Sequence, residues 1–443
     1  MRDLQSASRE ELLELIGALL AKVEALEACV AEVEEENQQL RKGGGKAVPA
    51  WVKPNRPARE KKERKPRGQA FVRRREPPDE VREHALERCP ECGRKLEGGW
   101  VHRRRQVIEI ELVRRVVEHV VVARHCGICG ERRIATLDPA ELGVQGRRRF
   151  GVSIQSLVAL LHGRHRVPLR EVGAFLEEGW GLHVSEGAIV ALLDGVAKAG
   201  KTEYEGLREQ VRQAPVVCAD ESGWRENGRN GFIWSFSTPE GRYFEFHLTR
   251  AGKVAEEVLG EDFRGVVSCD CYVGYNRLLA EKQRCWAHLL RDLHALKEAH
   301  AEEPAVLAWA REVQGLYTEA KAFASPNPVR RRKMRRALER RLDALVRRPS
   351  QRPGLSHRVL AQRLRQHLLE WFVFVERPEV PSDNNLAERS LRPAVIARKI
   401  SGGTRTAKGS ATKMGLLSLF GTWKLRGLSP LPICQRLLLT DCP

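Results

Sequence analysis

The chain has 443 residues, about three times the usual length of a single domain, so several modules are expected. Lys and Arg total 77 against 58 Asp and Glu, and the resulting net charge of +19 favours a long polyanion over a small neutral substrate. Nucleic acid is therefore the expected partner. An anionic membrane surface is the alternative, but no apolar run approaches the roughly 18 to 20 residues that span a bilayer, so we expect no membrane insertion.

The cysteines indicate a reducing compartment. There are eleven, an odd number, and two pairs have the spacing Cys-x-x-Cys. The charged N-terminus does not resemble a signal peptide. We therefore expect reduced thiols with a bound metal, in a cytoplasmic protein associated with the nucleoid.

Residues 1–42 predict a coiled coil. Apolar residues recur every seven positions, and a second series follows the first by four. The first series is Leu12, Leu19, Leu26, Val33 and Leu40, and the second is Ile16, Val23, Val30 and Asn37. Leu at d, β-branched residues at a and one polar a position favour a parallel dimer in fixed register. We expect self-association here, and the alternative is an amphipathic helix packed on its own domain.

Residues 43–80 are rich in Gly, Pro and basic residues and predict a linker, which either tracks phosphates or is simply solvated. Residues 81–140 contain two Cys-x-x-Cys-Gly pairs, formed by Cys89 with Cys92 and by Cys126 with Cys129. Four thiolates suit a structural Zn²⁺ ion, and the alternatives are a redox pair or unliganded thiols. Between the pairs, residues 107–113 and 116–122 predict a β-hairpin.

Residues 141–205 predict three helices, 153–161, 168–177 and 185–197, with Ser185 as an N-cap. Their spacing fits a helix-turn-helix that reads a major groove, and a plain helical connector is the alternative.

The pattern changes at residue 206, where the first part of a catalytic core is expected to run to residue 280. Period-two alternation predicts strands at 216–220, 231–236, 243–248 and 265–270, with a helix near 253–259. The first and fourth strands each end in an aspartate, Asp220 and Asp270. This order is the skeleton of a ribonuclease-H-like fold, in which the two carboxylates would lie together and bind a hard divalent cation.

A third carboxylate follows a long helical stretch. Residues 281–380 predict a helical insertion, in which ten Lys or Arg between Arg330 and Arg348 form either a phosphate-tracking face or a solvated one. Residues 381–443 would complete the core and add a C-terminal tail. There Ser382 or Asp383 is expected to cap a helix that carries Glu388.

At these residues the chain resembles the transposases of the insertion sequence 66 family, a branch of the Asp-Asp-Glu transposases. The matching stretches are Asp220 to Gly223, Asp270 to Asn276, Cys285 to His288, Asp383 to Lys399, Gly402 to Thr404 and Leu428 to Pro430. The resemblance covers nearly the whole chain. It implies that Asp220, Asp270 and Glu388 are the catalytic triad, and that residues from about 281 to 380 are an insertion. It predicts a multidomain α+β protein with a coiled coil, a four-cysteine zinc-binding element, a helical DNA-binding region and a ribonuclease-H-like catalytic core.

The resemblance also implies chemistry. Two Mg²⁺ or Mn²⁺ ions would serve strand cleavage by water and then strand transfer by the freed 3′-OH, on double-stranded DNA that comprises the element's terminal repeats and its target. Basic residues near the third acid are expected to meet the phosphate charge, and these are Arg389, Arg392, Arg398, Lys399 and Arg405. His288 is a further candidate catalytic residue, because it resembles the His of a Cys-x-x-His signature, although a packing role is an alternative.

Two other functions compete with an active transposase. One is a DNA-binding or assembly subunit that does no chemistry alone, because accessory transposition proteins are possible partners. The other is a ribonuclease-H-like nuclease acting on DNA. The complete set of three acids speaks against the first, and the long insertion together with the heptads speaks against the second.

Overall fold

The computed structural model describes residues 77–108, 113–135 and 148–440, together with Val23, Asp138 and residues 143–144. Its contacts divide the chain into two units, Met1–Ile110 and Glu111–Pro443. The predicted coiled coil, apart from Val23, and the predicted linker, apart from residues 77–80, lie outside the described residues. In the part of the chain that is described, no helix is long and apolar enough to cross a bilayer.

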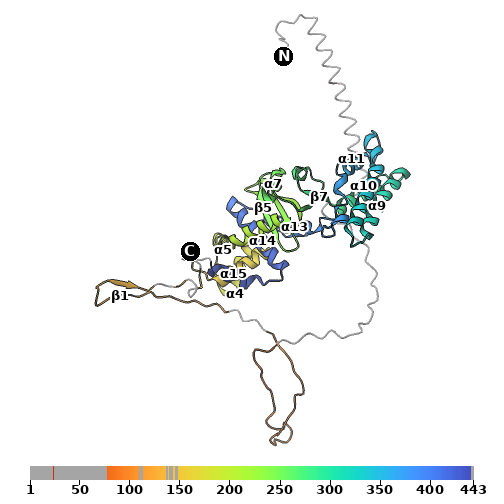
Figure 1. The fold of residues 1–443 in the computed structure, drawn as a ribbon. Coiled ribbons are helices and arrows are strands. Elements are labelled where there is room, and N and C mark those ends of the chain that lie inside the picture. The colour runs from red at the N-terminus through yellow and green to blue at the C-terminus, as the bar shows by residue number, and fades with distance from the viewer. Residues whose placement is uncertain are drawn as a thin grey trace. The chain divides into compact units, whose positions relative to one another are not determined.

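A five-stranded mixed sheet forms the centre of the second unit. Its strands are β3 (Val216–Glu226), β4 (Arg229–Ser237), β5 (Arg242–His247), β6 (Val266–Cys269) and β7 (Glu281–Arg284). They lie in the order β5-β4-β3-β6-β7, so β5 and β7 form opposite edges (Figure 1). The first three strands pair antiparallel, whereas β6 pairs parallel with both β3 and β7. The sheet therefore joins a hairpin meander to a parallel half.

The predicted strands are confirmed, with two differences. β3 continues six residues beyond Asp220 to Glu226, because Asn227 and Gly228 turn it into β4 with φ values of 48° and 75°. Two successive residues with positive φ are typical of a tight hairpin turn. The second difference is β7, which lies at the start of the segment expected to be helical. Its sequence, Glu-Lys-Gln-Arg, has no apolar residue to reveal a strand.

Helices cover both faces of the sheet. On one face, Val217, Ala219, Val267 and Cys269 pack in a core with α6 (Lys201–Gln213) and α7 (Lys253–Leu259). On the other face, Val216 and Val266 join the core of the helical segment that follows β7. Trp224 and Phe244 pack there against α13 (Asn385–Ser401) and α14 (Ala407–Leu425). Alternate residues of β3 thus face different helical layers, as a pleated strand requires.

The helical segment after β7 has a core of its own. It contains α8 (Trp286–Ala299), α9 (Pro304–Ala322), α10 (Pro328–Gln351), α11 (Arg358–Gln366), a 3₁₀ turn (Leu368–Glu370) and α12 (Val373–Glu376). Trp286, Trp309 and Trp371 are buried in this core. Figure 1 shows α9, α10 and α11 grouped beyond the β7 edge. The segment therefore carries the chain away from the sheet and returns it at α13.

The helices before the sheet pack with the end of the chain. They are α3 (Val152–Val158), a π-helical turn (Ala159–Arg164), α4 (Leu169–Trp180) and α5 (Glu186–Ala199). Their core is shared with α14 and with α15 (Pro430–Thr440). The Ser185 side chain accepts a hydrogen bond from the Ala188 N–H at 3.3 Å, which confirms the predicted N-cap.

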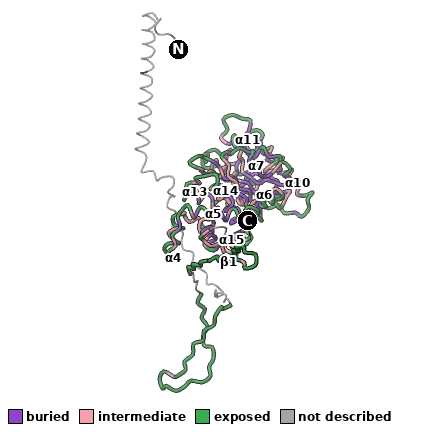
Figure 2. Tube along the Cα trace, turned by 90° about the vertical axis from the view of Figure 1, so that its left-hand side faces the viewer, coloured by how far each residue is buried: buried purple, intermediate pink, exposed green. Residues whose placement is uncertain are grey.

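The predicted hairpin between the cysteine pairs is wrong where the chain is described. Residues 107–108 and 113–122 contain no strand, and Figure 2 shows this stretch as exposed. The strands there are shorter and lie farther along, at β1 (Ala123–His125) and β2 (Arg132–Ile134). Isolated two-stranded ribbons are marginal without a packed face, so alternation of Val residues alone does not specify one.

Candidate active site

The sheet register brings Asp220 and Asp270 to corresponding positions on neighbouring strands. β3 and β6 pair in parallel, and the last pair in their register is Cys218 with Ser268. Two residues farther along each chain come Asp220 and Asp270. Asp220 accepts a hydrogen bond from the Glu221 N–H at 3.0 Å, and Asp270 accepts one from the Tyr272 N–H at 2.9 Å. Both aspartates therefore lie where the parallel pairing stops.

The electrostatics of Asp220 show how close the acids are. Burial, together with the charges of Glu221, Asp270 and Glu388, raises the pKa of its carboxyl to about 7. Within the described residues, neither Asp220 nor Asp270 forms an ion pair with a basic side chain. A group of like charges without a counter-charge is costly unless a cation neutralises it. Oxygen donors in this arrangement fit Mg²⁺ or Mn²⁺.

Glu388 lies in the first turn of α13, which two contacts fix against the sheet. The Asn384 side-chain amide donates to the Ala219 carbonyl at 2.7 Å, and Ser268 Oγ donates to the Asp383 carbonyl at 3.3 Å. Asn384 is the N-cap position of the helix, in place of the expected Ser382 or Asp383. Asp383 instead accepts a hydrogen bond from the Asn385 N–H at 3.1 Å, which forms the turn just before the helix.

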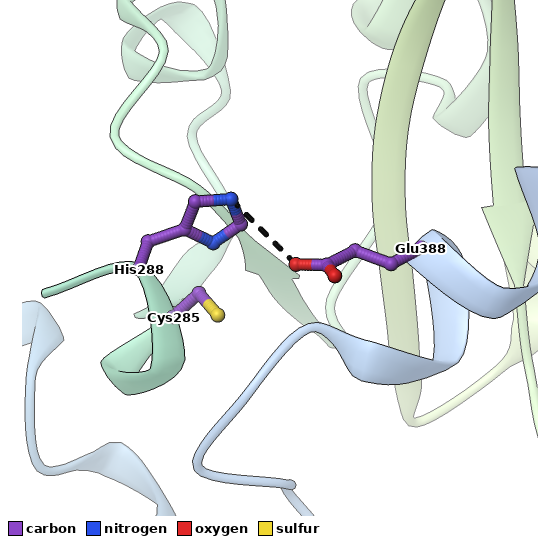
Figure 3. A group of neighbouring side chains, drawn as sticks. All are labelled: Cys285, His288 and Glu388. Atoms are coloured by element: carbon purple, nitrogen blue, oxygen red, sulfur yellow. Dashed lines mark ion pairs between the residues drawn. The ribbon is translucent and has the colours of Figure 1, made fainter. Parts of the chain in front are cut away.

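The Glu388 carboxylate is directed at helix α8. Its Oε1 atom is 3.2 Å from Arg291 Nη2 and 3.6 Å from His288 Nε2 (Figure 3). The Sγ atom of Cys285 completes a group whose ligand atoms all lie within 4.8 Å of one another. No other group of three such side chains meets this distance in the described part of the chain. Glu388 is thus electrostatically coupled to Asp220, but its closest partners belong to α8.

Glu221 is adjacent to Asp220 but lies on the opposite face of β3. Its carboxylate is 2% exposed, with one oxygen 2.6 Å from Arg250 and the other accepting a hydrogen bond from Tyr275 at 2.6 Å. Arg250 in turn lies over the Tyr272 ring, 3.9 Å from its centroid. This network accounts for the tyrosines that follow Asp270, because they tie that loop to β3 from behind the site.

Arg284 is the residue that sequence reasoning missed. This side chain is fully buried at the end of β7, and it donates to the Asp270 carbonyl at 2.7 Å and to Asn276 at 2.6 Å. Its third contact is an ion pair with Glu370 at 2.5 Å. Arg284 therefore fixes both ends of the loop that carries Asp270. A buried arginine on an unrecognised polar strand gave no signal in the sequence.

The residues predicted to bind DNA are partly accessible. Arg389, Arg392, Lys399 and Arg405 are exposed. Arg398 is half-buried and donates hydrogen bonds to the Gly223 carbonyl and to Ser222 of β3. Four of these cations are thus free to meet a phosphate, whereas Arg398 holds α13 against the sheet. Their role in DNA binding stays a prediction.

The glycines after α13 bring the next loop onto the end of β3. The Thr404 N–H donates to the Arg225 carbonyl at 2.8 Å, and the Thr404 hydroxyl accepts from the Trp224 indole at 3.1 Å. Gly403 has φ of +133°, and a Cβ there would be 2.1 Å from the Arg225 carbonyl oxygen. Only glycine permits this approach, which explains the Gly402-Gly403-Thr404 sequence.

Each predicted cysteine pair forms the same compact turn. In the first unit, the Gly93 N–H donates to the Cys89 carbonyl and the Cys89 N–H to the Arg94 carbonyl, both at 2.9 Å. In the second unit, Gly130, Cys126 and Glu131 repeat this pattern at the same distances. Both glycines have φ near +70°.

The turns also favour thiolates. The backbone N–H of Cys92 lowers the pKa of Cys89, and that of Cys129 lowers the pKa of Cys126. Thiolates on such turns are suitable ligands for Zn²⁺. That all four share one ion stays a prediction.

Comparison with known proteins identifies the class of protein and then the family. Residues 147–412, more than half of the chain, match the family model described as Transposase IS66 family. The match places the chain in the transposase class. It belongs to the IS66 family of transposases.

Three curated proteins of Sinorhizobium fredii (strain NBRC 101917 / NGR234) are also similar. Uncharacterized protein y4qI is 26% identical over 262 residues, which cover 51% of this chain and 47% of that protein. Uncharacterized protein y4jD is 24% identical over 292 residues, 57% of this chain and 55% of its own length. Uncharacterized protein y4jO is 40% identical over 70 residues, 16% and 22% of the two chains. The matches thus span about half the length of these relatives or less.

Replacing Arg284 with Met should destabilise the fold. The change leaves Glu370 without its closest cation and the Asp270 carbonyl without a donor, so we expect a loss of roughly 3 to 5 kcal/mol in the free energy of unfolding. Urea unfolding measures it. Arg264→Met is the matched control, because Arg264 is exposed and its contact with Asp262 is loose at 3.6 Å. Equal stability of the two variants would contradict the anchoring role.

Acid should weaken the same contact. Burial alone would raise the pKa of Glu370, but the hydrogen bond from His367 and the charges of Arg284 and Lys282 lower it to about 2. A carboxyl whose pKa is lower in the folded than in the unfolded state stabilises the fold above its ordinary pKa of 4.5, and this contribution is lost as the pH falls toward 2. Between pH 6 and 3, the free energy of unfolding should therefore fall more steeply for the parent protein than for Glu370→Gln. The same pH dependence in both proteins would show that the ion pair of Glu370 with Arg284 does not contribute to stability.

Proposed function

We propose that the chain binds the ends of its insertion sequence and catalyses divalent-metal-dependent cleavage and 3′-OH strand transfer of DNA. The observation that carries the proposal is the in-register placement of Asp220 and Asp270 beside Glu388, in a chain of the IS66 transposase family. We further propose that the core is ribonuclease-H-like. The strand order β5-β4-β3-β6-β7, with three antiparallel strands followed by two parallel ones, supports this.

The proposed metal ligands are Asp220, Asp270 and Glu388. When bound, Mg²⁺ or Mn²⁺ would activate the attacking hydroxyl and stabilise the leaving 3′ oxygen. The chain's own contribution is to hold these acids together: β3 and β6 position the aspartates, Arg284 holds the Asp270 loop, and Asn384 holds the start of α13. The Glu388 carboxylate contacts Arg291 and His288, and we propose that it would turn from them toward the aspartates to ligate the metal.

The same acids would serve two successive reactions. In the first, a water oxygen attacks the phosphorus at the element end, and the bond to the 3′ oxygen breaks. In the second, that 3′-OH attacks a target phosphodiester, a new P–O bond forms, and the target's own 3′ oxygen leaves. The exposed Arg389 and Arg392 lie one and four residues beyond Glu388 on α13, and we propose that they contact phosphates of the bound DNA.

Other parts of the proposal rest on the sequence. They are a self-associating coiled coil at residues 1–42, one structural Zn²⁺ held by the four cysteines, and DNA recognition by the helices of residues 141–205. A subunit that binds DNA without chemistry is the second candidate function. The unneutralised charge at Asp220 and Asp270 favours catalysis over this candidate, because a purely structural site has no need of it.

Neutral replacements of the three acids should abolish strand transfer without abolishing DNA binding. Asp220→Asn, Asp270→Asn and Glu388→Gln each remove a proposed metal ligand, so we expect at least a roughly 100-fold loss of joined product with labelled element-end DNA and Mg²⁺. Asp262→Asn is the control, because Asp262 is an exposed acid of the same domain. Undiminished joining by Glu388→Gln would remove Glu388 from the site, and binding without any product in the parent protein would favour the second candidate.

Replacing one cysteine in each of the two turns should remove one bound Zn²⁺ ion. Protein purified under reducing conditions is expected to lose one equivalent of zinc when Cys92 and Cys129 are both replaced by Ser, as measured by elemental analysis. Cys434→Ser is the control, since this thiol is buried in the core of α14 and α15. Equal zinc content in the three proteins would rule out the four-thiolate site.

A further inference from the structure

Three side chains beside the proposed aspartate pair have the donor atoms of a different kind of metal site. Cys285 contributes a sulfur, His288 an imidazole nitrogen and Glu388 a carboxylate oxygen, and these atoms all lie within 4.8 Å of one another. Figure 3 shows them converging from the start of α8 and the start of α13. Oxygen ligands alone would suit Mg²⁺, whereas a thiolate and an imidazole select ions of the transition series.

We propose that Cys285, His288 and Glu388 bind a transition-metal ion of the zinc class, at a position separate from the Asp220 and Asp270 carboxylates. Zn²⁺ with three protein ligands of these types retains one open coordination position, as in catalytic rather than structural zinc sites. The inference rests on the proposed function only in that Glu388 would serve both positions. Metal binding by the three side chains does not depend on catalysis.

The backbone holds the two α8 ligands in place. Cys285 and His288 are three residues apart at the start of α8, which places them on one face of the helix. The Cys285 N–H donates to the Cys269 carbonyl at 2.9 Å, and the Asn384 N–H donates to Cys285 Sγ at 3.1 Å. The sulfur therefore lies between the end of β6 and the start of α13, and its position is fixed by both.

Two buried polar atoms of these residues lack a hydrogen-bond partner, which supports the proposal. His288 Nδ1 is buried and has no hydrogen-bond partner, and the same holds for Oδ1 of Asn384, the residue whose backbone N–H donates to the Cys285 sulfur. Buried polar atoms without partners are rare in folded proteins, because each forfeits its hydrogen bonds to water. Either imidazole nitrogen can ligate a metal, so a ring rotation that exposes Nδ1 to the ion would satisfy it.

The competing contact at this position is weak. Arg291 pairs with Glu388 at 3.2 Å, but its side chain is 63% exposed and can turn into solvent.

Cobalt binding to the full-length protein tests the proposal, because Co²⁺ replaces Zn²⁺ and absorbs strongly when a thiolate is a ligand. We expect the parent protein to bind one more equivalent of Co²⁺ than His288→Ala or Cys285→Ser. We also expect the thiolate absorption of that equivalent to vanish in both variants, with affinity at least roughly 100-fold weaker. His294→Ala and Cys434→Ser are the controls, because His294 is exposed farther along α8 and Cys434 belongs to another core. Both should retain the equivalent.

The result separates this inference from the proposed function. His288→Ala removes a half-exposed side chain, so its folding is expected to survive even if Cys285→Ser does not fold, and thermal unfolding verifies this. Equal stoichiometry and equal spectra for the parent and His288→Ala would overturn the inference, whether or not the protein joins DNA with Mg²⁺ alone. Loss of the equivalent in a protein that joins no DNA would sustain the inference while the proposed function failed.

Discussion

The parallel pairing of β3 with β6 is the contact on which the site depends. It fixes Asp220 and Asp270 at matching positions, and it ends two residues before them, so both carboxylates emerge where the strands no longer pair. This placement is electrostatically unfavourable, because burial and neighbouring acids raise the pKa of Asp220 to about 7. The sheet tolerates this repulsion because it is buried on both faces, and the helical layers on either side hold the strands regardless of the charges at their ends.

The surrounding residues hold the loop after β6 in place, so Asp270 cannot move away from Asp220 to reduce the repulsion between the two carboxylates. Arg284 binds the Asp270 carbonyl, and Tyr275 binds Glu221 on the other face of β3. Each contact joins the loop to a different strand. The cation of Arg284 is itself balanced by Glu370 from the helical insertion, so the insertion contributes directly to the position of Asp270. It is a part of the site's support and not an appendage.

An element could be predicted from the sequence where its own residues determine it, and could not where contacts with distant residues do. β3 to β6 follow from alternating apolar residues and turn signals, so both aspartates could be placed in advance. β7 could not, because the polar Lys282, Gln283 and Arg284 are held by contacts with Glu370 and Trp371, which lie far along the chain. Glu388 is more than a hundred residues from Asp270, and only resemblance selected it. The Val-rich stretch near residue 117 was predicted to be a strand and is not one, because its valines are exposed and do not pack in a core.

Some of the basic side chains of α10 and α13 are held by contacts within the fold. On α10, Arg332, Arg335 and Arg341 form ion pairs with glutamates of other helices and strands, so part of that predicted phosphate-tracking face is neutralised within the fold. On α13, Arg398 is similarly engaged by the Gly223 carbonyl, while Asn384 at the other end binds the Ala219 carbonyl.

These two contacts hold α13 along β3 on either side of Asp220. Because both bind backbone oxygens, the helix keeps its place whatever the charge state of the acids beside it. Glu388 and the exposed cations that follow it thus belong to one helix held in place against β3, which is consistent with the proposal that Arg389 and Arg392 contact phosphates of bound DNA.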